Sequence, residues 1–270
     1  MDLDLHIHST ASDGMVRPAA VVEAAAEARL DVIALTDHDT VAGVPEALEV
    51  GRTLQVEVVP ALEVSTTLGD LELHILGYFV DPTDSALLAH TGEAAGRRRD
   101  RLRGMVRKLE AEGVQIEFDR VVAAGAGGGA LGRPHLARAM VEAGYVGSVP
   151  EAFDRYIGND HPAYIPTRLI DPEGAIRLIR GAGGIAVWAH PPMRHLDTYL
   201  PVLAEAGMAG LEVYRPRNPV GRVRQLEEEA GRRGLVRAGG SDWHGPDGGP
   251  LGEFRVEASD VAELLKMGGM

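Results

Sequence analysis

The sequence contains no cysteine, few aromatic residues and no long apolar run. Without cysteine, a disulfide framework, a thiolate zinc site and a cysteine nucleophile are all excluded, and the absence fits a reducing compartment. No stretch approaches the roughly 20 apolar residues that a membrane-spanning helix needs. The first eight residues also lack the basic segment of a signal peptide. We therefore expect a cytoplasmic protein without a membrane partner.

Basic residues are in the minority, with 27 Lys and Arg against 40 Asp and Glu and a formal net charge of −13. An acidic chain has little general affinity for a nucleic-acid backbone unless its basic residues are concentrated somewhere. Charged residues make up 25% and apolar residues 45% of the 270 positions. This composition excludes wholesale disorder, and a core built mainly from Ala, Leu and Val is expected.

Short apolar runs alternate with longer helical patterns along most of the chain. Strand-like runs lie at 3–8, 31–36, 55–64, 71–78, 184–189, 210–214 and 235–239, and helical patterns lie at 18–29, 41–51, 172–181, 196–206 and 219–233. Strands separated by helices of this length predict parallel β–α–β units. Continuous apolar strands predict a sheet that is covered on both faces. The pattern indicates an α/β fold.

Residues 83–168 interrupt this alternation and are predicted to form a small helical domain inserted into a barrel domain of residues 1–82 and 169–270. Apolar residues between 102 and 109 have the spacing of a buried helical stripe. A stretch rich in Gly and Ala follows at 123–130, and we expect flexible loops to join the insertion to the barrel.

Histidines and carboxylates gather at the carboxyl ends of the predicted strands, the edge at which parallel α/β folds carry their sites. His6 and His8 are two positions apart on one strand, so their rings point the same way, about 7 Å apart. Asp13 follows in a turn, and His74 lies within a strand. The full set is His6, His8, Asp13, His38, Glu63, His74, His190, Asp242 and His244.

Six histidines and three carboxylates at one edge would repel or titrate one another unless cations neutralise them. Neutral imidazoles and carboxylates are ligands for Zn, Mn or Fe, and nine ligands exceed what one ion needs. The sequence therefore predicts a cofactor of two to three divalent metal ions (Mn, Fe or Zn). Taken alone, the H-x-H pair fits equally well as two polar side chains on a half-exposed strand.

The motifs that carry these residues resemble those of the PHP (polymerase and histidinol phosphatase) family. They are H-I-H-S-T-x-S-D-G, L-T-D-H-D, x-x-E-V-S, E-L-H-I-L-G-Y, A-H-P and S-D-W-H, in order over residues 1–80 and 165–245. The resemblance implies a distorted (β/α)7 barrel, the PHP fold, with a trinuclear site. It also implies that one ion is held by His6, His8, Glu63 and Asp242, that Glu63 bridges to a second held by His74 and His190, and that the third is held by Asp13, His38 and His244.

The insertion resembles that of a PHP subgroup that hydrolyses nucleotide phosphates, including 3′,5′-bisphosphates, or trims RNA from its 5′ end. In that subgroup such a segment overhangs the metals, so His135 is expected to touch the phosphate or to donate a proton to the leaving group. A structural histidine at a helix start is the alternative.

A basic run at 97–108 holds seven basic residues and one acidic residue. Arg98 and Arg101 extend the buried stripe of this helix, so we expect them to face the junction between the domains. Together with Arg133 and His135, they are the predicted substrate-binding residues. A solvated helix face is the alternative for this run.

These observations predict a metal-dependent phosphoesterase that hydrolyses phosphate monoesters of nucleotides by attack of a metal-bridging hydroxide. His135 and Asp242 are the predicted catalytic residues. The expected partner is a small phosphorylated substrate, a nucleotide, with short RNA as an extension, and no obligate protein partner is evident. Three alternatives stay open: a histidinol phosphate phosphatase, a non-catalytic metal-stabilised PHP module, and a hydrolase of amides or esters.

Overall fold

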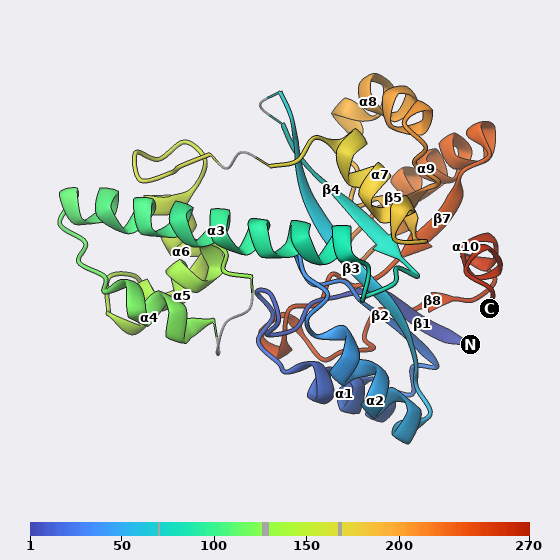
Figure 1. The fold of residues 1–270 in the computed structure, drawn as a ribbon, viewed down its shortest axis with the longest axis horizontal. Coiled ribbons are helices and arrows are strands. Elements are labelled where there is room, and N and C mark those ends of the chain that lie inside the picture. The colour runs from blue at the N-terminus through green and yellow to red at the C-terminus, as the bar shows by residue number, and fades with distance from the viewer. Residues whose placement is uncertain (70, 126–129, 167–168) are drawn as a thin grey trace.

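The computed structural model describes residues 1–69, 71–125, 130–166 and 169–270. An eight-stranded sheet forms the body of the protein, and a lobe of helices projects from one side of it (Figure 1). The order of the strands in the sheet is β7-β6-β5-β4-β3-β2-β1-β8. They are β1 (Asp2–Ile7), β2 (Val32–Leu35), β3 (Glu57–Leu68), β4 (Leu71–Tyr78), β5 (Ile185–Trp188), β6 (Gly210–Tyr214), β7 (Val236–Gly239) and β8 (Val256–Glu257).

The sheet curls into a nearly closed barrel. Strand β8 pairs with the beginning of β1 in the antiparallel sense, while the segment after β7 reaches the end of β1, where the Asp242 N–H donates to the His6 carbonyl at 2.9 Å. Gly240 permits this approach, because a Cβ at that position would collide with the backbone of His6. The predicted barrel is confirmed, with the short β8 added at the closure.

The parallel β–α–β pattern does not extend to β4. Strands β3 and β4 form an antiparallel hairpin in which Leu68 lies opposite Leu71, and β4 is also antiparallel to β5. A two-residue connection that begins with Gly69 is the sequence signal for such a hairpin. In this hairpin His74 lies opposite Ser65, in the middle of the ladder. His74 therefore lies within a strand, as predicted.

Helices cover the outside of the barrel and one of its ends. Helices α1 and α2 pack on the strands β1 to β3, and α7, α8 and α9 cover the opposite side (Figure 1). Side chains of α10 join the apolar cluster inside the barrel. The bounds are α1 (Pro18–Glu27), α2 (Val44–Leu54), α7 (Pro172–Gly181), α8 (Met193–Glu205), α9 (Val220–Arg233), α10 (Ala262–Met267) and a 3-10 turn η2 (Pro246–Gly248).

The barrel interior has an apolar layer below a polar layer. Alternate residues of a strand point to the same face, so Ala61 and Glu63 of β3 both point inward, as do Leu76 and His74 of β4. Ala61 and Leu76 belong to the apolar cluster inside the barrel, whereas Glu63 and His74 contact each other above it. The polar layer therefore rests on packed apolar side chains, which fix the position of its members.

The inserted lobe has an apolar core of its own. Leu102, Met105 and Met140 belong to its buried cluster, whereas Leu87, near the start of α3, packs with the barrel. Helix α3 thus runs from the barrel into the lobe (Figure 1). The elements of the lobe are α3 (Ser85–Ala111), α4 (Phe118–Ala124), α5 (Arg133–Glu142), α6 (Val149–Ala152) and a π-helix η1 (Phe153–Ile157).

The domain boundaries stay a prediction. The boundary at 168–169 falls partly outside the described residues, as does much of the glycine-rich stretch at 123–130.

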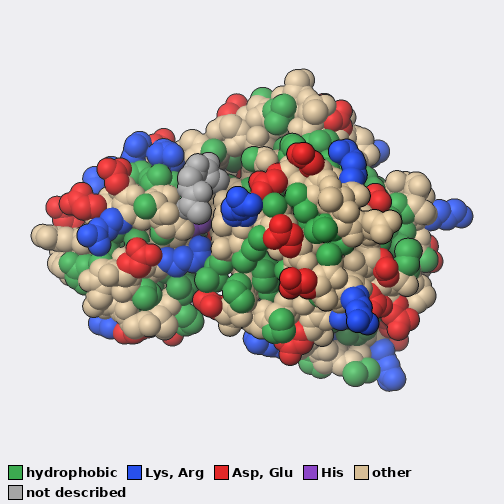
Figure 2. Space-filling model, turned by 90° about the horizontal axis from the view of Figure 1, so that it is seen from below, with side chains coloured by type: hydrophobic (Ala, Val, Ile, Leu, Met, Phe, Trp, Pro, Cys, Tyr) green, Lys and Arg blue, Asp and Glu red, His purple; other side chains and the backbone are tan. Residues whose placement is uncertain are grey.

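Figure 2 shows acidic and basic side chains interspersed over one face of the protein, on which almost no histidine is visible. Within the described ranges, no helix combines the length and the apolarity needed to cross a bilayer.

Candidate metal centre and substrate site

The structure brings the nine predicted metal ligands together at the mouth of the barrel. At their centre is the carboxylate of Glu63, whose side chain is 1% exposed. Five imidazoles surround it, with nitrogen–oxygen distances of 3.3 Å to His6, His8 and His38, 2.9 Å to His74 and 3.0 Å to His190. Two carboxylate oxygens cannot satisfy five rings, so the arrangement is typical of a cation site.

Asp242 and His190 enter this cluster from unusual backbone conformations. Asp242 Oδ1 lies 3.4 Å from His6 Nε2 and 3.3 Å from His8 Nε2. The backbone φ angle is 58° at Asp242 and 31° at His190, a region that residues other than glycine rarely occupy. Such strain persists only where the surrounding structure holds it, and it concentrates at functional sites.

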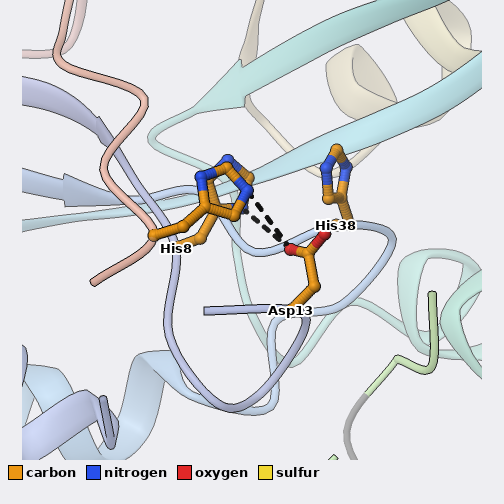
Figure 3. A group of neighbouring side chains, drawn as sticks. His8, Asp13 and His38 are labelled. Carbon is orange, nitrogen blue, oxygen red and sulfur yellow. Dashed lines mark ion pairs between the residues drawn. The ribbon is translucent and has the colours of Figure 1, made fainter. Parts of the chain in front are cut away.

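Asp13, His38 and His244 form the outer part of the cluster. His244 Nε2 lies 3.5 Å from Asp13 Oδ1, and the rings of His8 and His244 stack with their centroids 4.2 Å apart. The Asp13 carboxylate points toward the rings of His8 and His38 (Figure 3). Asp13 lies on the loop after β1. Asp37 holds that loop by accepting hydrogen bonds from the Ser9 N–H and from the hydroxyls of Ser9 and Ser12.

The protein groups alone perturb the pKa values of this cluster in opposite directions. Burial disfavours the charge on His8, but hydrogen bonds to Asp242 and Glu63 outweigh it and raise the pKa of His8 to about 10. Contact with Glu63 likewise overcomes burial and raises the pKa of His74 to about 10. At His38 burial prevails and lowers the pKa to about 3. The competing charges call for a cation that replaces protons.

The donor set suits divalent metal ions. Atoms of His8, Asp13, His38 and His244 lie within 4.8 Å of one another, as do those of two smaller groups: His6, His8 and Glu63, and His38, Glu63 and His74. Among the described residues, the buried His8 Nδ1 has no hydrogen-bond partner. These imidazole and carboxylate groups could hold metal, while the division into three ions and their ligand sets stays a prediction.

Sequence reasoning missed Glu212, a fully buried carboxylate inside β6. Its Oε1 accepts a hydrogen bond from His6 Nδ1 at 2.7 Å, and its Oε2 accepts one from the His190 N–H at 2.6 Å. A carboxylate that accepts from the outer nitrogen of a ligand histidine orients the ring and raises its basicity. The signal was present in the sequence as a single acid within the apolar run Gly210–Tyr214.

Arg98, predicted to bind substrate, is engaged within the protein. Its Nε donates to Asp39 Oδ2 at 2.8 Å, and its Nη2 donates to the same oxygen and to Ser65 Oγ. The Asp39 side chain is 2% exposed and follows His38 directly in the chain. Arg98 therefore ties α3 to the barrel beside a predicted ligand, in keeping with its expected place at the junction.

Arg101 and Arg133, also predicted to bind substrate, lie together over the ring of Tyr164, with Cζ-to-centroid distances of 5.4 and 5.3 Å. Burial and the neighbouring Arg133 charge lower the pKa of Arg101 to about 10. Arg101 Nη2 is buried and has no hydrogen-bond partner among the described residues. Both cations help to hold the pKa of Glu72 at about 2, although contact with His74 has the largest effect. The pair thus faces the His74 side of the cluster.

His135, the predicted proton donor, is 1% exposed at the start of α5. Its Nδ1 accepts a hydrogen bond from the Gly132 N–H at 2.9 Å, and burial lowers its pKa. The ring is therefore neutral at pH 7 with its proton on Nε2. The same helix contacts the metal cluster's loop, where Arg138 donates to the Asp13 carbonyl at 2.7 Å.

Comparison with known proteins agrees with this geometry. Residues 4–117 match the PHP domain family. A 3′,5′-nucleoside bisphosphate phosphatase from Chromobacterium violaceum is 32% identical over 253 residues, 92% of this chain and 89% of the relative. This chain belongs to the PHP family. The expected family is confirmed, and the matched segment includes the ligand motifs from His6 to His74.

Further relatives extend the match to the remainder of this PHP protein. The 5′-3′ exoribonuclease Rnm of Escherichia coli is 33% identical, covering 90% of this chain and 85% of the relative. A phosphoribosyl 1,2-cyclic phosphate 1,2-diphosphodiesterase from Eggerthella lenta is 35% identical, covering 94% and 99%. A solved structure of a Bifidobacterium adolescentis protein assigned as a metal-dependent phosphoesterase has a TM-score of 0.90 at 32% identity, covering 98% and 96%.

Proposed function

We propose that this PHP protein is a metal-dependent phosphoesterase that hydrolyses phosphate monoesters of nucleotides. The substrates are nucleoside 3′,5′-bisphosphates and 5′-monophosphates, with short 5′-phosphorylated oligonucleotides as an extension. The observation that carries this proposal is the convergence of six imidazoles and three carboxylates beneath a lobe that supplies arginines. Relatives named for phosphatase, exoribonuclease and diphosphodiesterase activities support it.

Divalent ions bound at this cluster would polarise the phosphate and make water a nucleophile near neutral pH. The protein's own contribution is to place and neutralise the substrate. Arg101 and Arg133 present guanidinium groups on the His74 side of the cluster, where they can bind phosphate oxygens. His135, whose Nδ1 accepts from the Gly132 N–H, has an Nε2–H that can donate a hydrogen bond to the phosphate or to the leaving oxygen. Asp242 and His135 are the residues we propose as catalytic.

The insertion also limits what can enter. Arg98 anchors the lobe at Asp39, and Arg138 anchors it at Asp13, so the roof is fixed at two points beside predicted ligands. A roof held in this way favours small substrates over structured polymers. We therefore expect mononucleotides and bisphosphates to be hydrolysed faster than long RNA.

The test is an activity screen after reconstitution with Mn²⁺, Fe²⁺ or Zn²⁺. Its substrates are nucleoside mono- and bisphosphates, a ribose cyclic phosphate, histidinol phosphate, short 5′-phosphorylated RNA and structured long RNA. The proposal expects the highest kcat/KM on nucleotides. Preference for histidinol phosphate, or equal rates on structured long RNA, would contradict it. If metal removal unfolds the protein and the metal-bound protein hydrolyses none of these substrates, the domain is instead a metal-stabilised structural module.

A further inference from the structure

A cavity of about 750 Å³ opens beside the metal cluster on the side of β6 and β7. Two of the predicted ligands, Asp242 and His244, form part of its wall. His244 is the most exposed of the nine, with 36% of its side chain accessible, whereas His6 and His8 are completely buried. The cluster is thus accessible from this cavity, whose size lies within the roughly 300–1,000 Å³ that is typical of small-molecule sites.

The cavity is separate from the arginines of the lobe. Its lining comes from the loops after β1, β6 and β7, and none of the described residues between 83 and 166 belongs to it. Arg101 and Arg133 lie on the His74 side instead. A phosphate at the metal cluster would therefore have a cationic roof on one side and this cavity on the other.

The walls of the cavity combine three kinds of surface. Met15, Trp243 and Phe254 provide an apolar wall, and Asp247 and Glu253 provide carboxylates. Arg215 and Arg217 provide guanidinium groups, of which Arg215 is engaged by Asp242 through its Nη2 at 2.6 Å. The Trp243 ring is held in place because its Nε1 donates to the Gly249 carbonyl at 2.9 Å. Met15 is 43% exposed and is therefore accessible from the cavity that it lines.

The apolar wall and the carboxylates match a nucleoside. A base can pack on the apolar wall, since base–aromatic contacts are favourable for every base. Carboxylates accept hydrogen bonds from ribose hydroxyls, as they do in dinucleotide sites. We propose that this cavity binds the nucleoside portion of the substrate while its phosphate lies at the metal cluster. The inference rests on the proposed function and adds the specificity for nucleotides over other phosphate esters.

The first measurement uses adenosine, which carries no phosphate and so reports on the cavity alone. Trp243 is one of two tryptophans in the chain, and the other, Trp188, is fully buried. Adenosine should quench tryptophan emission of the metal-reconstituted protein in a saturable manner. Phe254→Ala should weaken this binding about tenfold, which is the size of one base–aromatic contact.

The second measurement compares KM for adenosine 3′,5′-bisphosphate with the inhibition constant of inorganic phosphate. Phe254→Ala should raise this KM about tenfold and leave phosphate inhibition within roughly twofold, because inorganic phosphate binds at the metal cluster and Phe254 is not one of the predicted ligands. Met15→Ala, at an exposed position, should raise KM by a smaller factor and keeps the test valid if Phe254→Ala does not fold. Met267→Ala is the matched control, since Met267 is 56% exposed on α10 and lies outside the cavity.

The outcomes separate the two proposals. Turnover of nucleotides with unchanged KM in both variants, or absence of adenosine binding to the parent protein, would overturn the cavity assignment and leave the phosphoesterase intact. An equal change in phosphate inhibition would also overturn it, because the variants would then be acting on the metal cluster. A lack of activity on every nucleotide would refute the proposed function, and adenosine quenching would still decide whether the cavity binds nucleosides.

Discussion

Replacing Glu212 by glutamine tests whether a fully buried carboxylate organises the metal centre. Glu212 accepts one hydrogen bond through each oxygen, from His6 Nδ1 and from the His190 N–H. Glutamine has nearly the same shape but only one accepting oxygen. Its amide NH₂ must therefore face one of two donors, and one buried N–H loses its partner. The substitution removes one hydrogen bond and the negative charge that faces Arg215 Nε at 3.4 Å, and it changes little volume.

The expected losses follow from the two contacts. A buried donor left without a partner costs about 1–3 kcal/mol, which for a chain of this size lowers Tm by roughly 2–12 °C. Loss of an outer hydrogen bond to a ligand histidine typically weakens metal binding about 10- to 100-fold. We expect Glu212→Gln to show both effects, and Glu212→Asp to resemble it, because a shorter side chain cannot span both donors.

The assay is a chelator competition for Mn²⁺ together with thermal unfolding of the metal-free and metal-bound protein. Glu228→Gln is the matched control, because Glu228 is exposed on α9 and makes none of the hydrogen bonds or ion pairs found in the described structure. Metal affinity and Tm equal to those of the parent in Glu212→Gln would refute the reasoning. A loss of Tm with unchanged metal affinity would leave Glu212 as a packing residue only.

Four further outcomes follow from the site. The reconstituted protein should carry two to three divalent ions per chain by elemental analysis, and His8→Ala should abolish turnover; less than one ion per chain would contradict the cluster. Arg101→Ala or Arg133→Ala should raise KM and reduce kcat/KM by roughly 10- to 100-fold with metal content intact, whereas unchanged kinetics would remove the lobe from the active site. His135→Ala should lower kcat on nucleotides by about 100-fold, with a smaller loss on nitrophenyl phosphate, whose leaving oxygen needs less stabilisation by a hydrogen bond; equal losses on both substrates would exclude a contact between His135 and the leaving oxygen. Metal affinity should rise with pH from 6.5 to 8.5, since the pKa values of about 10 at His8 and His74 mean that binding displaces protons; an affinity independent of pH would show that neither ring is protonated beforehand.

The ligand residues could be predicted from the sequence because their signals are local. Most lie near the end of a short apolar run or in a turn, and the two-residue period of a strand already places His6 and His8 on one side. The helices of the lobe were equally visible, since the buried stripe between 102 and 109 depends only on the 3.6-residue period. Glu63 was predicted for the same reason from the apolar run before it, although β3 continues past it to Leu68.

Only the tertiary structure decided how these pieces meet. Glu212 is 206 positions from His6 along the chain, and Arg98 is 59 from Asp39, so neither pairing leaves a periodic trace. The direction of β4, which brings His74 to the mouth, depends on a hairpin whose turn signal is two residues long. Side chains in such pairings are chosen by the space and charge that distant segments leave them, and that information exists only once the barrel has closed.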